Sequence, residues 1–452
     1  MSNLAEKVTV REIYITANRF GEGKTVNILP VSLELDIYEN IALPYLTASL
    51  VILDAADIFG LAQLSGSEKI VIVFESSLDQ VPIQKTFVVG SISSTKNNDS
   101  TAILVFSLIE NIGAVNNLTK ISKSYEGFGE EIIAKIVRDN FNQEIIDLSR
   151  SSSDIDSGIP KSEQSKFRYI LPYITPFAGI NTVLQKITTP RGLPFFFYST
   201  ISSNQLILKD LETILSTEPY NAKAPLFYSA DTAQRGDDVM RSFFNIDEYT
   251  ESRYNEDTLS LAMGGAITSL VNVTDITSGE QTPFTVEVGR IVEALVNARI
   301  TDQPLLLYDH LFQPNDDGRT IEQYTPAVIN LLNTETFPGG PLGYNQEALT
   351  AQHFLKVVRR GILSHLTKNT FTISGPGAIM STTNLSATVG NQISVRILNN
   401  VLGEGGQQEQ IDNKRSGNFI ITAKKISIMV PEDNHSYTLN LARVSNQQRI
   451  DR

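Results

Sequence analysis

The first hundred residues alternate between apolar and polar positions with a period of two. Over Ser32–Tyr38, for example, Leu33, Leu35 and Ile37 fall on one side and polar residues on the other. This alternation is typical of strands that bury one face, and polar or glycine-bearing turns separate the stretches that show it. We therefore predict a small antiparallel β-barrel. Its strands are Val8–Thr16, Thr25–Leu29, Ser32–Tyr38, Lys69–Glu75, Thr86–Ser93 and Ala102–Ile109, with one or two helical turns at Ala55–Leu64.

Helical spacing of apolar residues begins after these strands. Glu130–Phe141 and Pro176–Ile187 each place isoleucine, leucine or valine on one face at intervals of three and four residues, which predicts amphipathic helices. Between them, the polar, serine-rich segment Ser149–Lys166 is expected to be an exposed loop. A hairpin between Pro194–Tyr198 and Gln205–Leu208 completes what the pattern indicates is a compact α+β unit.

Strand patterns return in the second half of the chain and are interrupted before it ends. We expect Phe243–Thr250 and Gly265–Thr274 to form paired strands. Three helices are then predicted, at Arg290–Ala298, Pro326–Leu332 and Glu347–Leu363. The final predicted strands are Phe371–Ser374, Gln392–Leu398, Phe419–Val430 and Tyr437–Val444.

Together these patterns predict a β-rich α+β fold in four parts. The parts are a first β-barrel domain over residues 1–111, an α+β domain over 112–215, a second β-barrel domain over 216–282 and 365–452, and a mainly helical insertion over 283–364. The second barrel is thus discontinuous in sequence, and a similar β domain is expected at each end of the chain.

Composition limits the classes of function. The chain has 452 residues, of which 41% are apolar, enough for about two to four domains. Only 19% are charged, a low share that indicates surface buried in subunit contacts. A formal net charge of −13 argues against binding nucleic acid through its phosphates, although an acidic wall would let DNA slide past. The absence of cysteine excludes disulfides and thiolate metal sites.

The sequence shows no targeting or membrane signal. Met1–Arg11 carries charges early and lacks the apolar centre of a signal peptide. No stretch reaches the roughly 18 uninterrupted apolar residues of a membrane helix. We therefore expect a protein that is made in a cytoplasm and has no membrane anchor.

Three motifs resemble ligand-binding loops but lack part of the pattern. Gly21–Thr25 looks like the end of a phosphate-binding loop, yet Asn18 stands where that motif needs its first glycine, so a hairpin loop is expected. Asn315–Gly318 resembles a calcium loop without two of its charged ligands, which favours a polar turn. Gly375–Gly377 is interpreted as a tight turn, because its central proline removes an amide that would face phosphate.

No catalytic, metal-binding or cofactor-binding residues are predicted. The four histidines have no partners at zinc-site spacing; they are His310, His353, His365 and His435. His353 falls in a predicted amphipathic helix and is interpreted as a surface or packing residue. The 50 aspartates and glutamates include many pairs, but the sequence does not reveal which lie at the separation that glycoside hydrolysis requires. A solvated acidic surface is the simpler interpretation.

Several segments are informative through their order and spacing. They are Leu64–Phe74, Tyr173–Ile180 with Gly192–Tyr198, Thr370–Gly377 with Ala387–Val395, and Ser416–Thr422 with Tyr437–Leu441. In this order they resemble the first tube domain, the second domain and the second tube domain of the baseplate hub proteins of tailed phages, the family that includes the T-even hub. The related spike proteins of type VI secretion begin with the same module. Residues 283–364 show no specific resemblance.

The resemblance implies two tube-type β-barrels per subunit, so that a homotrimer presents six. Such a ring joins the sixfold tail tube to the threefold central spike around a DNA channel. The implied protein is structural and not an enzyme, has no cofactor, and belongs to the tail baseplate of a virion assembled in the host cytoplasm. Its implied partners are further copies of itself, a separate central spike protein and a tail tube or tube-initiator protein, with baseplate wedge and tape-measure proteins as further candidates. DNA is expected to pass without specific binding along an acidic or neutral wall.

Three alternatives stay open. The first is the hub of a phage-like contractile injection system. The sequence ends directly after the last tube-type strand, without the oligonucleotide-fold domain and β-helical spike of the secretion protein, and this favours a phage or such an injection system over the secretion protein. A glycan hydrolase with paired carboxylates is a second alternative. A receptor-binding tail protein is a third, although the chain has no tryptophan to form an aromatic platform.

Overall fold

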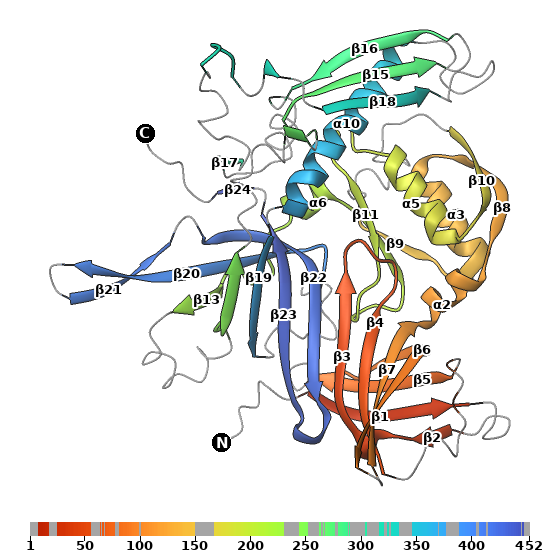
Figure 1. The fold of residues 1–452 in the computed structure, drawn as a ribbon, viewed down its shortest axis with the longest axis vertical. Helices are drawn as coiled ribbons and strands as arrows, with labels where there is room; N and C mark the ends of the chain where they lie inside the picture. The colour runs from red at the N-terminus through yellow and green to blue at the C-terminus, as the bar shows by residue number, and fades with distance from the viewer. Residues whose placement is uncertain are drawn as a thin grey trace.

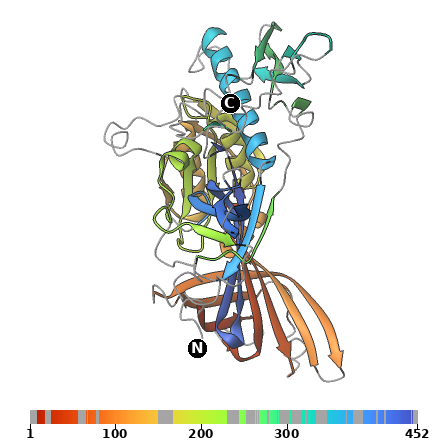
Figure 2. The ribbon, with the colours of Figure 1, turned by 90° about the vertical axis from the view of Figure 1, so that its left-hand side faces the viewer.

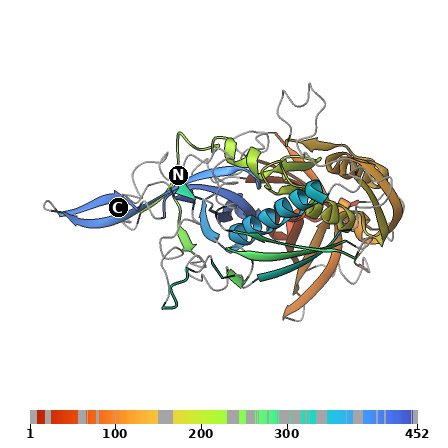
Figure 3. The ribbon, with the colours of Figure 1, turned by 90° about the horizontal axis from the view of Figure 1, so that it is seen from above.

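The computed structural model shows an elongated molecule with β-sheets at both ends (Figure 1). The N-terminal strands lie at one end, helices and short sheets in the middle, and a three-stranded sheet with a long helix at the other end (Figure 2). A long hairpin projects sideways from the body (Figure 3). The residues described are 8–17, 25–55, 64, 66, 68–76, 81–98, 101–149, 167–229, 244–251, 262–263, 265, 267–275, 279–287, 289, 303–304, 316–320, 323–324, 327–333, 346–368, 370–376, 388–403, 406–412, 415–443 and 445–446.

Seven strands form the N-terminal β module. They are β1 (Val8–Thr16), β2 (Thr25–Asn27), β3 (Ser32–Asn40), β4 (Thr47–Asp54), β5 (Lys69–Ser76), β6 (Ile83–Asn98) and β7 (Thr101–Glu110). Neighbouring strands are antiparallel, in the order β3-β4-β7-β6-β5-β1-β2. Leu35 and Ile37 of β3 are buried as predicted. Leu33 is only half-buried, because the register with β4 shifts between Ser32 and Glu34.

The middle unit contains short helices and strands. They are α2 (Asn111–Leu118), β8 (Ile121–Gly127), α3 (Gly129–Phe141), β9 (Ile145–Asp147), β10 (Phe167–Ile174), α5 (Pro176–Lys186), β11 (Phe195–Tyr198), β12 (Leu206–Asp210) and α6 (Leu211–Ser216). Ile133 of α3 and Val183 of α5 share one apolar core. At the start of α5, the Thr175 side chain accepts a hydrogen bond from the Ala178 amide at 3.4 Å, as an N-cap does. Both predicted helices and the predicted hairpin are confirmed.

The C-terminal β module combines strands from before and after the insertion. They are β13 (Leu226–Ser229), β14 (Glu248–Glu251), β19 (Thr370–Pro376), β20 (Gln392–Gly403), β21 (Gly406–Ile411), β22 (Gly417–Met429) and β23 (Asn434–Ala442). They pair in the order β14-β19-β23-β22, and β20 pairs with β22, β13 and β21. β20 and β21 form the projecting hairpin (Figure 3). The four strands predicted near the end of the chain are confirmed.

The two β modules repeat one strand order. With β2 and β21 set aside and the other six strands of each module numbered along the chain, both orders are 2-3-6-5-4-1. Four of the five neighbouring pairs agree in direction, whereas β1–β5 is antiparallel and β13–β20 parallel. Each module also closes in the same way. The main-chain oxygen of Ile13 accepts a hydrogen bond from the Ile28 amide at 2.9 Å, and that of Phe227 accepts one from the Ile246 amide at 2.8 Å. In this way β1 is bonded to the segment just before β3, and β13 to the segment just before β14.

A β-bulge marks equivalent positions in the two modules. The register of β6 with β7 shifts after Val89, and that of β22 with β23 shifts after Ile421. The amide of Val89 donates to the oxygen of Glu68, and the amide of Ile421 donates to the oxygen of Asn391, both at 2.9 Å. Val89 and Ile421 are therefore equivalent, and so are the strands that contain them.

One strand pairing joins the two modules. β3 and β22 are antiparallel over seven residue pairs, from Glu34 opposite Met429 to Asn40 opposite Ala423. The sheet consequently continues from one module into the other (Figure 1). Ile426 of β22 packs in the apolar core of the N-terminal β module. The joint is therefore part of a hydrophobic core as well as of a sheet.

The prediction that Phe243–Thr250 and Gly265–Thr274 pair with each other is wrong. β14 pairs with β19. β15 (Ser269–Asp275) is instead the centre of a separate sheet, between β16 (Gln281–Val286) and β18 (Ala327–Asn333). Because β18 is remote in sequence, no local pattern reveals this pairing. Two further short strands, β17 (Gln303–Pro304) and β24 (Ser445–Asn446), pair with each other.

The helix expected at Pro326–Leu332 is also a wrong prediction. Residues 327–333 form β18, which runs parallel to β15 over seven residue pairs, and the β-branched Val328 and Ile329 favour an extended strand. α10 (Gln346–Lys368) confirms the predicted helix at 347–363. Its Val358 and Ile362 pack in the same core as the C-terminal β module. The described part of residues 283–364 therefore supplies β18 and most of β16 to a small sheet, together with one long helix.

The tight turn expected at Gly375–Gly377 is not observed at Gly375 and Pro376, the two of these residues that the structure describes. Gly375 and Pro376 are the last residues of β19, opposite Tyr437 and Ser436. A Cβ on Gly375 would run into the Tyr437 side chain, so the glycine serves close packing between strands. Other predictions fall wholly or largely outside the described residues: the helical turns at 55–64, the hairpin loop at 21–25, the loop at 149–166, the helix at 290–298 and His310.

We predict that Gly390→Ala lowers the free energy of unfolding by about 2–5 kcal/mol. Gly390 has a φ of +76°, and a Cβ there would overlap the Tyr198 side chain. Backbone strain at positive φ costs about 1–2 kcal/mol, and overpacking adds about 1–3 kcal/mol. Gly279→Ala is the matched control, because Gly279 has a φ of +73° with open space around it. If urea unfolding gives the same loss of unfolding free energy for the two variants, the expected overlap between the new Cβ and the Tyr198 side chain does not occur.

Candidate functional site

Glu39 lies where three parts of the molecule meet, and it is buried on β3. Its carboxylate accepts the amide of Ile201 at 2.7 Å and the amide of Val389 at 3.4 Å. The first amide comes from the loop between β11 and β12, and the second from the turn before β20. In the register of the β3–β22 joint, Glu39 stands opposite Lys424. One carboxylate thereby connects both β modules and the middle unit.

Two buried lysines interact with Glu39. Burial lowers the pKa of Lys424, and the charge of Glu39 opposes this shift. Burial likewise lowers the pKa of Lys85 on β6, against the opposing charges of Glu110 and Glu39. The Lys85 ammonium lies 3.7 Å from the Glu110 carboxylate. We call Glu39, Lys85, Glu110 and Lys424 the polar junction; its carboxylates offset part of the desolvation cost of its ammonium groups.

The polar junction also fixes the loop between β11 and β12. The ammonium of Lys85 donates to the main-chain oxygens of Thr200 at 3.0 Å and Ser203 at 2.5 Å. The hydroxyl of Ser199 donates to the Glu110 carboxylate at 3.1 Å. Because these contacts join residues remote in the chain, the loop holds the middle unit against the N-terminal β module.

Lys209 ties the middle unit to the C-terminal β module. Its ammonium donates to the main-chain oxygen of Gly390 at 3.1 Å and to the side-chain oxygen of Asn391 at 2.6 Å. Burial lowers the pKa of Lys209 to about 8, with the charge of Asp210 opposing the shift. The side-chain amide of Gln392 donates to main-chain oxygens around the end of α6, where a helix leaves carbonyl groups unpaired. The three parts are thus connected by hydrogen bonds at two places.

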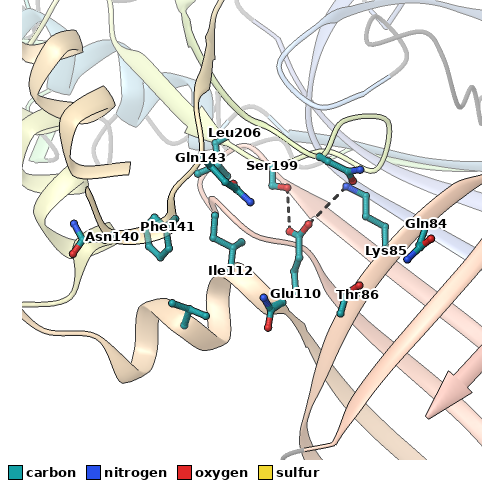
Figure 4. Close-up of a pocket in the computed structure, with 13 residues that line it drawn as sticks. Gln84, Lys85, Thr86, Glu110, Ile112, Asn140, Phe141, Gln143, Ser199 and Leu206 are labelled. Carbon is teal, nitrogen blue, oxygen red and sulfur yellow. Dashed lines mark hydrogen bonds and ion pairs between the residues drawn. The ribbon is translucent and has the colours of Figure 1, made fainter. Parts of the chain in front are cut away.

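A cavity of about 540 Å³ lies beside the polar junction (Figure 4). Ile112 and Phe141 of the middle unit line it on one side and Lys85 of β6 on the other. Figure 4 shows the Glu110 carboxylate between the hydroxyl of Ser199 and the ammonium of Lys85. Among the described lining residues, Glu110 is the one carboxylate. The described lining residues therefore do not include the two facing acids that glycoside hydrolysis requires.

The residues singled out in the sequence do not gather at this junction. Asp317 accepts hydrogen bonds from the amide of Arg319 at 3.1 Å and from the hydroxyl of Tyr324, as expected for a polar turn. His353 is buried in α10 and His435 in β23. Within the described ranges, no group of three or more histidines, aspartates and glutamates could hold a metal ion. No helix in the described part of the chain has the length and apolar character needed to cross a membrane.

The polar junction was not predicted from the sequence, although part of a signal was present. Glu39 follows Ile37 with the period of two that places both on the buried face of β3, and Lys85 stands in the same way between Ile83 and Phe87. A charged residue at an inward position requires a buried partner. The loop that supplies those partners is remote in sequence, so the sequence could indicate the charges but not what they bind.

The fold is one that solved tail proteins share, which confirms the predicted resemblance at the level of the fold. The tail protein from Neisseria meningitidis MC58 is 13% identical, with a TM-score of 0.51 over 97% of this chain and 96% of that one. The 43 kDa tail protein of prophage MuSo2 from Shewanella oneidensis is 12% identical, with a TM-score of 0.52 over 96% of this chain and 98% of that one. The E. coli c3393 protein, a component of the type VI secretion system, is 9% identical over 97% of this chain and 77% of its own, with a TM-score of 0.41. No protein-family model and no curated protein matches the sequence.

We predict that Glu39→Gln lowers the free energy of unfolding by about 3–5 kcal/mol. The substitution removes the negative charge opposite Lys424 and leaves a buried ammonium with less compensation, which is a costly change in a protein interior. Glu12→Gln, at an exposed position of β1, is the matched control and should change stability by less than about 0.5 kcal/mol. Urea unfolding measures both. Similar values for the two variants would show that Glu39 is not a structural charge.

A second prediction concerns pH. Because the pKa of Lys209 is lowered to about 8 in the folded chain, the unfolded chain binds more protons above that pH, and linkage makes folding more favourable as pH rises. From about pH 8 to pH 10, wild-type protein should gain about 2 kcal/mol relative to Lys209→Met. Lys223→Met, at an exposed position, should keep the wild-type profile. Parallel profiles for wild type and Lys209→Met would refute the lowered pKa.

Proposed function

We propose that this chain is the baseplate hub subunit of a phage tail, and that three copies form a ring. The observation that carries the proposal is the repetition of one strand order in two joined β modules. Three copies would place six such modules around an axis, as many as a sixfold tail tube presents. The fold shared with two phage tail proteins supports the same assignment.

The joint between the modules supports a closed ring. Pairing of β3 with β22 fixes one step between successive modules. If the same step is repeated between copies, the contacts are head-to-tail and the assembly closes when the rotation divides the circle evenly. A closed ring also removes free strand edges, which otherwise promote aggregation.

In this role, the ring would join a tail tube or tube-initiator protein on one side to a separate central spike protein on the other. Baseplate wedge and tape-measure proteins would be further neighbours. DNA would pass through without specific binding, and the net charge of −13 favours a channel wall that repels phosphate. The protein would act mechanically, without a cofactor or catalytic activity, in the tail baseplate of a virion assembled in the host cytoplasm.

We expect the purified chain to have three times its monomer mass of 49.9 kDa. Obligate interfaces bury well over about 1,000 Å², so the trimer should persist on dilution. Light scattering measures the mass, and electron microscopy should show rings with six lobes around a central channel. A monomer over the whole accessible concentration range, or open filaments in the micrographs, would contradict the hub proposal.

A further inference from the structure

The second half of β6 is an open edge among the described strands. β6 pairs with β5 only as far as Val88, while its pairing with β7 continues through Ser91 to Asn98. From Ser91 onward, no described strand lies on the other side. Ser91 and residues 93–95 are exposed and Ile92 is half-buried.

The equivalent half of β22 is paired. β22 meets β20 as far as Ile420 and then, from Ala423 to Met429, pairs with β3. Since Val89 and Ile421 are equivalent, Ser91 corresponds to Ala423 and Thr95 to Ser427. Among the described strands, the N-terminal β module therefore leaves unpaired the edge that the C-terminal β module uses to join the two modules.

The strand equivalent to β3 likewise has one unpaired edge among the described strands. In each module, residues that lie directly opposite one another can be followed across four neighbouring strands, β6-β7-β4-β3 and β22-β23-β19-β14. They are Ser91, Ser107, Ser49 and Asp36 in the N-terminal β module, and Ala423, Asn440, Thr372 and Thr250 in the C-terminal β module. Thr250 of β14 is thus the equivalent of Asp36 of β3. Among the described strands, β14 pairs with β19 alone, whereas β3 pairs with both β4 and β22.

We propose that β6 of one copy pairs with β14 of the next, repeating between copies the joint that β22 and β3 form within one chain. The internal joint sets Asp36 opposite Ser427, so the equivalent register sets Thr250 of one copy opposite Thr95 of the next. The pairing is antiparallel and head-to-tail. This inference rests on the proposed ring and names the strands that close it.

The chemistry of the open edge supports a protein partner. Exposed edge strands are normally protected by charge, proline or bulges that twist them away, but Ser91–Thr95 is uncharged and rich in serine. Short side chains let another backbone approach the edge, and each N–H and C=O group there requires a partner once water is excluded. A second copy of the chain supplies one through its β14, which pairs with β19 alone among the described strands.

A cysteine pair tests the proposed register, since the natural chain has no cysteine. Opposed residues of antiparallel strands have Cα atoms about 4.5–5.5 Å apart, within the range that a disulfide spans. Thr95→Cys combined with Thr250→Cys should therefore give a covalent trimer on mild oxidation, seen on a denaturing gel and reversed by a reductant. Each single variant should stay monomeric on that gel.

Two further pairs serve as matched controls. Asp36→Cys with Ser427→Cys occupies the equivalent register position inside one chain. Oxidation should therefore form a disulfide within each chain, and the protein should stay at monomer mass on the denaturing gel. Ser107→Cys with Thr250→Cys places an exposed cysteine one strand away from the edge and should give no covalent trimer.

The outcomes separate this inference from the proposed function. A covalent trimer from the Thr95 and Thr250 pair alone supports the strand pairing. Trimers by light scattering that do not become covalent, while the internal control pair does, overturn the strand pairing and leave the ring proposal standing. Protein that is monomeric by light scattering overturns both.

Discussion

The pairing of β3 with β22 is the constraint on which the rest of the structure depends. Side chains alternate along a strand, so a slip of one residue would turn an entire face outward. Such a slip would move Glu39 away from the amides of Ile201 and Val389 and from its place opposite Lys424. The two β modules therefore have one relative placement, and the loop that carries Ile201 positions the middle unit with them.

The buried charges at this joint fix how its parts are placed relative to one another. Removing an ion from water costs several kcal/mol, and apolar residues of similar volume often give equal stability. Apolar contacts, however, are not directional, and a core formed by them alone tolerates small displacements. The carboxylate of Glu39 and the ammonium of Lys85 bind main-chain groups at hydrogen-bonding distance, which only one arrangement of the parts satisfies. The polar junction thus contributes geometry more than net stability.

The sequence predicted the elements of this fold better than their pairings. Alternation located most strands of the two β modules because burial of one face leaves a period of two in a single stretch of chain. The same reasoning failed at Pro326–Leu332, since a short apolar run fits a helix or a strand equally well until its neighbour is known. The pairing of β15 with β18, the shared strand order and the contact between Lys85 and Thr200 all join remote segments. No local periodicity contains that information.

The internal joint and the proposed joint between copies share geometry but differ in chemistry. Within the chain, Lys424 is buried and Asp36 pairs with Lys425 at 3.0 Å. At the equivalent positions, β6 has Ile92 and β14 has Thr250. Because β3 and β22 belong to one chain, they are at high effective concentration. The cost of desolvating charges at their joint therefore lowers the stability of the folded subunit and does not oppose association between copies. Separate copies must instead lose translational freedom and desolvate their edges on meeting, and hydroxyl and aliphatic side chains lose less hydration than ions do. A ring built in this way would keep the buried charges of the polar junction inside each subunit and would join the copies by main-chain pairing.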